Sequence, residues 1–432
     1  MNVVRVGIYS LIVLAVLTFG GVEAWGQATF QIGTALLFVF WGALVIRRPQ
    51  LELHWNWLYL PLLGLGLVAS AQLAFGLSGY PYMTKLELLK WASSSLLFFL
   101  TIESFKSGDH VRQFVWFLVS LGFVVALFGI VQHFTSNGRL YWFVPVPPGA
   151  GFFGPFVNRD HFAGFMELTI PFGLALLLFQ AWRREQLTIL FLFTIVPIGA
   201  LILTASRGGI IGLFFEIVLL VFLSRRQQIG RRPLLTAAAV LLVAGSFIAW
   251  LGVNMAIERF EQLAGGGISQ ELRLSIYRDT GRIIFDHPWI GTGLGTLATV
   301  YPQYASFYNG LTVDHVHNDY LELLADTGIA GGLCGLSYFV LLFWRGFTTF
   351  GSQRTPFARA AIAGALTSCT GLLLHGLVDF NFHIPSNGLI FLLVSGIATA
   401  GWGVVPRYRH VSLAVKSSEP DLPFPASVTN RM

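Results

Sequence analysis

The stretch QFVWFLVSLGFVVALFGIVQH at residues 113–133 decides the fold class. It contains no Lys, Arg, Asp or Glu, and its length matches the roughly 20 residues that a helix needs to cross a bilayer. Because lipid offers no hydrogen-bond partner to the backbone, such a segment satisfies its own peptide groups as a helix. The stretch therefore predicts a transmembrane helix.

Segments of the same character recur along all 432 residues, of which 55% are hydrophobic and only 11% charged. A soluble domain carries about 25% charged residues, and a larger core does not remove the need for a charged surface. We therefore predict an all-α polytopic membrane protein with a single transmembrane domain at 1–405 and a polar, disordered tail at 406–432. About 12 transmembrane helices are expected, at 6–22, 28–46, 57–76, 87–104, 113–133, 161–180, 187–204, 208–224, 234–252, 319–343, 357–376 and 386–405.

The basic residues indicate the orientation of these helices. Of the 27 lysines and arginines, 18 lie at the termini or in every second loop. They are Arg5, Arg47, Arg48, Lys106, Arg112, Arg183, Arg184, Arg225, Arg226, Arg231, Arg232, Arg345, Arg354, Arg359, Arg407, Arg409, Lys416 and Arg431. Because cytoplasmic loops are enriched in Lys and Arg, we predict an inner-membrane protein with both termini cytoplasmic.

Two features of the composition exclude other classes. The net charge of +6 is spread over short basic pairs between apolar segments, which argues against a nucleic-acid-binding face. Cys334 and Cys369 lie inside apolar segments, so they indicate neither a disulfide framework nor a metal cluster. Residues 6–22 also fit a cleavable signal segment, although the eleven further spans favour a retained helix.

The long periplasmic insertion expected at 253–318 contains an amphipathic segment. In SQELRLSIYRDTGRIIFD, residues 269–286, apolar side chains recur at helical spacing before Pro288 and the glycine-rich turn GTGLG. A helix of this kind lies at a membrane surface. We therefore expect short amphipathic helices over the outer mouth of the bundle.

Two basic motifs are expected on the periplasmic side of the membrane. Arg207, between Ser206 and two glycines, opens a helix whose N-terminal amides favour anions, although an arginine there can also be a snorkelling helix end. Arg273, Tyr277 and Arg278 lie close together on the amphipathic helix. Such a stripe binds either a lipid diphosphate or anionic lipid head groups.

A third motif, DHVHNDYLE at 314–322, runs into a helix. His317 is suited to general-base chemistry near neutral pH, whereas a purely structural alternative makes Asn318 or Asp319 the helix cap. His315 and His317 form an HxH pair, but HExxH is absent and no further His or Cys follows at ligand spacing. We therefore expect no metal and no cofactor.

Other polar residues are expected near the same mouth. Asp160 is a candidate helix cap, with Arg159 facing the outer cavity. Glu167 and Glu216 lie within apolar spans, where ionisable residues usually face the bundle interior. For the last outward turn we favour a structural role, bracing the mouth; its polar residues are His375, Asp379 and His383.

These motifs resemble the O-antigen ligase family, which includes O-antigen ligases, O-antigen polymerases and pilin-type O-oligosaccharyltransferases. The family pattern is a His, then Asn, Ser or Gln, nine residues, Gly, two residues, and Gly, Thr or Tyr. It is matched by His317-Asn318, Gly328 and Gly331. RLSIYRDTGRIIFDHPWIGTGLG at 273–295 is similar to the family's segment ahead of that histidine, and Ser206-Arg207-Gly208 to its arginine turn. The similarity covers roughly residues 150–400.

The resemblance implies inverting, metal-independent transfer of a glycan from undecaprenyl diphosphate to an acceptor hydroxyl at the periplasmic face. It implies three catalytic residues. Arg207 and Arg273 would bind the diphosphate leaving group, and His317 would activate or position the acceptor hydroxyl. The expected substrate-binding residues are Arg159, Arg278, Tyr277, His315 and Asn318. Expected partners are the lipid-linked donor, membrane lipid and a glycan, lipid A core or protein acceptor, with no nucleic acid.

Two alternatives remain open at this point. A polymerase of the same family would add the glycan to a second repeat unit. A transporter of the lipid-linked glycan would belong to a different class, but transporters often show interrupted helices at matching positions in two halves. Here the polar motifs are concentrated after residue 150.

Overall fold

The computed structural model describes residues 1–46, 53–146, 151–181, 184–225, 270–308, 310 and 312–402. In that part of the chain the regular structure is helical, apart from two isolated β-bridges. The helices are α1 (Asn2–Leu17), η1 (Phe19–Gly21), α2 (Ala24–Ile46), α3 (Tyr59–Ala74), α4 (Pro81–Ser104), α5 (Gly108–Thr135), α6 (Arg159–Leu178), α7 (Arg184–Leu203), α8 (Arg207–Arg225), α10 (Gln270–Asp286), α11 (Leu297–Val300), η2 (Tyr301–Gln303), α12 (Asp319–Ser352), α13 (Pro356–His375), η3 (Asn381–His383) and α14 (Pro385–Thr399).

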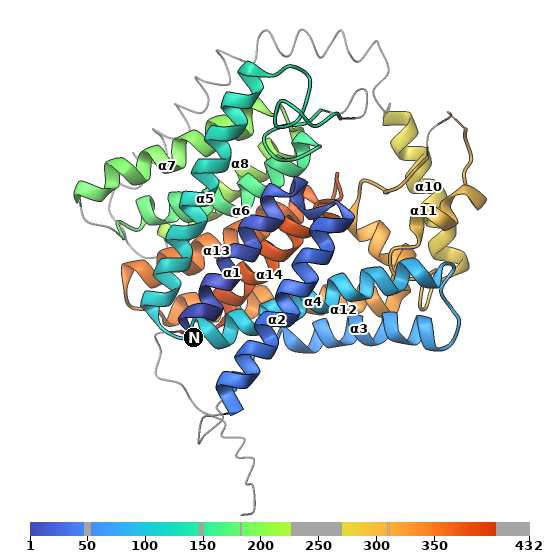
Figure 1. Cartoon of the computed structure of the whole chain (residues 1–432), viewed down its shortest axis with the longest axis horizontal. Coiled ribbons are helices and arrows are strands. Elements are labelled where there is room, and N and C mark those ends of the chain that lie inside the picture. The colour runs from blue at the N-terminus through green and yellow to red at the C-terminus, as the bar shows by residue number, and fades with distance from the viewer. Residues whose placement is uncertain are drawn as a thin grey trace, which may run out of the picture.

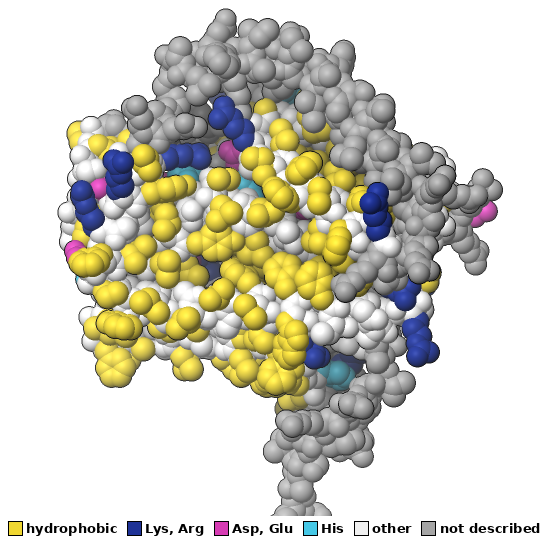
Figure 2. All heavy atoms as spheres, turned by 180° about the vertical axis from the view of Figure 1, so that it is seen from behind, with side chains coloured by type: hydrophobic (Ala, Val, Ile, Leu, Met, Phe, Trp, Pro, Cys, Tyr) yellow, Lys and Arg dark blue, Asp and Glu magenta, His cyan; other side chains and the backbone are white. Residues whose placement is uncertain are grey.

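Within these ranges, seven helices are long and apolar enough to cross a membrane. Three shorter apolar helices accompany them: α1, α3 and α14. One face of the molecule is covered with hydrophobic side chains, with Lys and Arg mainly toward its margins (Figure 2), as expected of a surface solvated by lipid. The predicted class, an all-α polytopic membrane protein, is confirmed. The number twelve stays a prediction, because the expected span 234–252 and the tail 406–432 lie outside the described residues.

The centre of the bundle is formed by α6 and α13, and α14 packs against both (Figure 1). The most apolar stretch of α6 is completely buried, and that of α13 is 83% buried. Small residues allow this close packing: a Cβ at Gly364 of α13 would lie 3.1 Å from the Cα of Phe172 in α6. Small side chains at an interface let helix backbones approach each other in a membrane.

Helix ends differ from the predicted spans where glycine changes the backbone. The first helix stops at Leu17 and not at residue 22, because Gly20 and Gly21 adopt φ of +78° and +80°, a region that side chains rarely allow. α12 is broken at Gly328, where φ is 61° and ψ is −162°. A Cβ at Gly328 would lie 2.5 Å from the backbone N of Ile290, so only glycine lets the loop after α10 pack here.

That loop is held against α12 by backbone hydrogen bonds. The amide of Ile329 donates to the carbonyl of Pro288 (2.7 Å), and the amide of Gly293 donates to the carbonyl of Asp326 (2.9 Å). α10 occupies the predicted amphipathic segment and packs against α12. The glycine-rich turn 291–295 therefore fixes α10 next to the start of α12, where the histidine motif lies.

Candidate active site

His317 lies directly before α12 and is held in an unusual backbone conformation. Its φ is +56°, which is uncommon outside glycine and often marks a functional position. The hydroxyl of Tyr277 on α10 donates to its carbonyl (3.1 Å), and Asn318 caps α12 by accepting hydrogen bonds from the amides of Tyr320 and Leu321. The loop therefore holds the His317 side chain, which is 18% exposed, in a fixed place.

The partner of His317 is Asp379, from the turn between α13 and η3. Its Oδ1 lies 3.1 Å from Nδ1 of His317, while its Oδ2 lies 3.8 Å from Nε2 of His161 on α6. Burial raises the pKa of the Asp379 carboxyl. The hydrogen bond with His317 and the charges of nearby histidines outweigh burial and lower that pKa to about 2. Asp379 is therefore an anion that orients the imidazole of His317.

The ring of Phe380 packs against three histidines. His315 stacks on it with a centroid distance of 4.1 Å, whereas His161 and His317 meet it edge-on at 4.6 Å and 5.0 Å. Edge-on and stacked arrangements at these distances stabilise aromatic pairs. Phe380 thus brings His161 of α6 together with His315 and His317 of the loop before α12.

A second network joins His315 to carboxylates of α12. Nδ1 of His315 lies 2.7 Å from Glu322, and Nε2 of His383 lies 3.3 Å from the same oxygen. Nδ1 of His383 lies 2.9 Å from Asp319. Burial lowers the pKa of His383, but the carboxylates of Glu322 and Asp319 outweigh it and raise that pKa to about 10, so the imidazole is positively charged at neutral pH.

This network bears on whether the site could bind a metal ion. No third ligand for a metal was expected near His315 and His317, yet the ligand atoms of His315, Glu322 and His383 lie within 4.8 Å of one another. Two histidines and a carboxylate are a common ligand set for zinc. The same contacts also form a complete ion-paired network, which is the interpretation we adopt and test below.

The two predicted catalytic arginines lie on different elements. Arg273 of α10 is partly buried, and its Nη1 donates to the carbonyl of Val378 (3.3 Å), the residue before Asp379. Arg207 is exposed at the start of α8. Its neighbour Gly208 meets the ring of His375, since a Cβ there would lie 2.5 Å from the ring's Cδ2. Arg273 therefore contacts the segment 375–379 directly, and Arg207 is next in the chain to a glycine that meets it.

The remaining predicted binding residues fall into two groups. Asn318 donates from Nδ2 to the carbonyl of Leu377 (2.9 Å), so it joins the histidine loop to the same segment 375–379. Arg278 is exposed on α10, and Arg159 is partly buried at the start of α6. The cap of α6 is Asn158, whose side chain accepts from the amide of Asp160, so the sequence placed that cap two residues too late.

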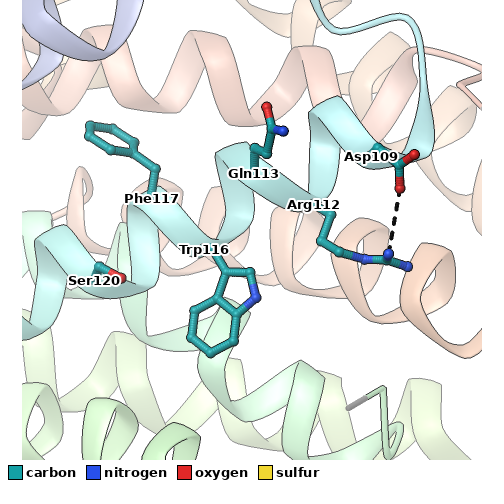
Figure 3. Close-up of a pocket in the computed structure, with 6 residues that line it drawn as sticks. All are labelled: Asp109, Arg112, Gln113, Trp116, Phe117 and Ser120. Carbon is teal, nitrogen blue, oxygen red and sulfur yellow. Dashed lines mark hydrogen bonds and ion pairs between the residues drawn. The ribbon is translucent and has the colours of Figure 1, made fainter. Parts of the chain in front are cut away.

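Of two cavities, one lies away from the candidate site residues and the other adjoins them. One, of about 600 Å³, runs along α5 and is lined by Asp109, Arg112, Gln113, Trp116, Phe117 and Ser120 (Figure 3). It contains no candidate site residue. A second cavity of about 230 Å³ is mostly apolar and is lined also by Lys90, Glu87, Asp319 and His383. It therefore adjoins the carboxylate–histidine network from the side of α3 and α4.

Part of the chain is similar to known proteins. A family model described as O-antigen ligase matches residues 189–336, a range that contains Arg207, Arg273 and His317. An O-antigen ligase from Pseudomonas aeruginosa is 25% identical over 296 residues, which are 67% of this chain and 64% of the relative. Both comparisons support the O-antigen ligase family. The chain thus matches a little under two thirds of the length of this ligase.

The family match ends before the segment that completes the site. Residues 375–383 lie beyond residue 336, and the sequence assigned them only a bracing role. The structure places Asp379 against His317, and His383 against Glu322. The clue in the sequence was the density of ionisable residues in GLVDFNFHIP at 376–385 beside an apolar helix.

Proposed function

We propose that this protein transfers a glycan from undecaprenyl diphosphate to an acceptor hydroxyl at the periplasmic face of the bacterial inner membrane. The observation that carries the proposal is the His317–Asp379 contact of 3.1 Å, next to the arginine-bearing α10. The family supports glycan transfer in general. The donor, the side of the membrane and the roles below belong to the proposal.

His317 is the general base. An imidazole that donates from Nδ1 to Asp379 leaves Nε2 free to accept a proton. The acceptor oxygen attacks the anomeric carbon as its proton moves to Nε2 of His317. The bond from that carbon to the diphosphate oxygen breaks, and its electron pair leaves with the diphosphate. Attack opposite the leaving group inverts the anomeric centre.

Arg207 and Arg273 stabilise the departing diphosphate. Guanidinium groups bind phosphate oxygens through paired, charge-assisted hydrogen bonds, and such donors act most strongly where negative charge develops. Their positive charges perform the electrostatic role that a metal ion performs in other transferases, so the reaction requires no metal. Arg159, Arg278, Tyr277, His315 and Asn318 surround the donor and acceptor.

A transfer assay tests this function. Purified protein is incubated with undecaprenyl-diphosphate-linked glycan and, in turn, a lipid A core, a second glycan repeat and a protein acceptor. Transfer to lipid A core supports a ligase, and lengthening of the glycan supports the alternative polymerase. If no acceptor is glycosylated while liposomes containing the protein move the donor across the bilayer, the transporter alternative replaces the proposal.

A further inference from the structure

A pair of ionisable side chains lies inside the bundle directly beneath the site. Nδ1 of His375 at the end of α13 lies 2.6 Å from Oε2 of Glu167 on α6, and the two side chains are 1% and 0% exposed. Burying such groups is costly unless they pair. Neither side chain reaches the surface that would meet a substrate, and the reaction proposed above gives them no task.

The backbone of His375 holds the turn that carries Asp379. Its carbonyl accepts hydrogen bonds from the amides of Val378 (2.9 Å) and Asp379 (3.1 Å). Val378 in turn accepts from Arg273, and Asp379 contacts His317. The position of His375 therefore affects both Arg273 and His317.

The ring of His375 also contacts the arginine turn. Gly208 follows Arg207, and a Cβ at Gly208 would lie 2.5 Å from Cδ2 and 2.6 Å from Nε2 of His375. Glycine at position 208 is thus required for the ring to occupy its place. The contact connects His375 to the third catalytic candidate, Arg207.

We propose that the Glu167–His375 pair is a positioning element that sets the relative placement of Arg207, Arg273 and His317. The proposal rests on the proposed function for its kinetic consequence, but its structural consequence is independent of it. Glu167 anchors the imidazole, and the imidazole fixes both the turn 375–379 and Gly208. A displacement of about 1 Å at such a site costs up to about 100-fold in rate.

The test compares three variants with a matched control. Glu167→Gln and His375→Gln remove the charged contact with little change of volume, while Gly208→Ala displaces the ring without altering either charge. Glu103→Gln is the control, because Glu103 on α4 is also a buried, ion-paired carboxylate (2% exposed), and its partner Lys106 (2.9 Å) is not a residue of the candidate site. Amide hydrogen exchange of residues 376–383 and the kinetics of glycan transfer are measured for each.

We expect faster exchange in 376–383 and a kcat lowered about 10- to 100-fold in the three variants, with neither change in Glu103→Gln. The double variant Glu167→Gln/His375→Gln should be no worse than the worse single variant, because both substitutions remove one contact. Unchanged exchange in the three variants, or an equal change in the control, would overturn the proposal. If the wild-type protein transfers no glycan, the proposed function fails, but the hydrogen-exchange data still test whether the Glu167–His375 pair positions the turn.

Discussion

Nδ1 of His317 and Oδ1 of Asp379 lie 3.1 Å apart although the residues are separated by 62 positions in the chain. His317 comes from the loop before α12 and Asp379 from the turn after α13. A buried carboxylate next to an imidazole fixes the ring's orientation and stabilises the imidazolium that forms when the ring takes a proton. In the proposed mechanism, this contact orients the imidazole of His317 for its role as the base.

Removing either member of this pair should stop or slow glycan transfer. His317→Ala removes the base, so transfer should become undetectable, while Asp379→Asn should lower kcat about 10- to 100-fold through a misoriented ring. Asp109→Asn is the control, since that side chain is 84% exposed on α5. Steady-state kinetics in detergent or nanodiscs measure the effect. Full activity of His317→Ala in folded protein would remove it from the mechanism.

The arginines should act mainly on the donor. Arg207→Ala and Arg273→Ala should each weaken donor use about 10- to 100-fold, the factor that corresponds to the loss of a charged hydrogen bond. Lysine at either position should recover only part of the loss, because it lacks the planar fork. Arg282→Ala on the same α10 is the control, as that side chain is 63% exposed and pairs with Asp279. Unchanged donor kinetics in both alanine variants would exclude the diphosphate role.

Chelation should leave the reaction unaffected. The network of His315, Glu322 and His383 is explained by ion pairs, so we expect the same rate before and after dialysis against EDTA. The measurement is transfer activity together with metal analysis of the purified protein. A different outcome would make this cluster a metal site: EDTA reproducibly lowers transfer activity, zinc restores that activity, and Glu322→Gln abolishes the recovery with zinc.

The stability of the protein should fall at alkaline pH because of His383. Its pKa is raised to about 10 in the folded protein, against about 6.5 in an unfolded chain. The stabilisation is therefore fully present below pH 6.5 and is lost as the pH rises to 10. Thermal unfolding between pH 6 and pH 10 should show a larger fall in Tm for the wild type than for His383→Gln. Parallel curves would contradict the ion-paired network.

The sequence predicted the fold class and several residues of the candidate site. Apolar length predicted helices because lipid permits no other backbone structure, and α5, α8 and α13 begin and end within a few residues of their predicted spans. The helical spacing of apolar residues in 269–286 predicted α10. Arg207, Arg273 and His317 stood out because charged residues at membrane depth are costly and seldom retained without a function.

Which residues meet was decided by the tertiary structure alone. The proximity of Asp379 to His317, of His383 to Glu322 and of His375 to Gly208 depends on how α6, α8, α12 and α13 pack. Sequence spacing gives the faces of one helix, whereas contacts between helices depend on crossing angles and on glycines that permit close approach. The sequence therefore determined the helices and the catalytic candidates, and the packing of the helices decided that the turn 376–383 contacts those candidates.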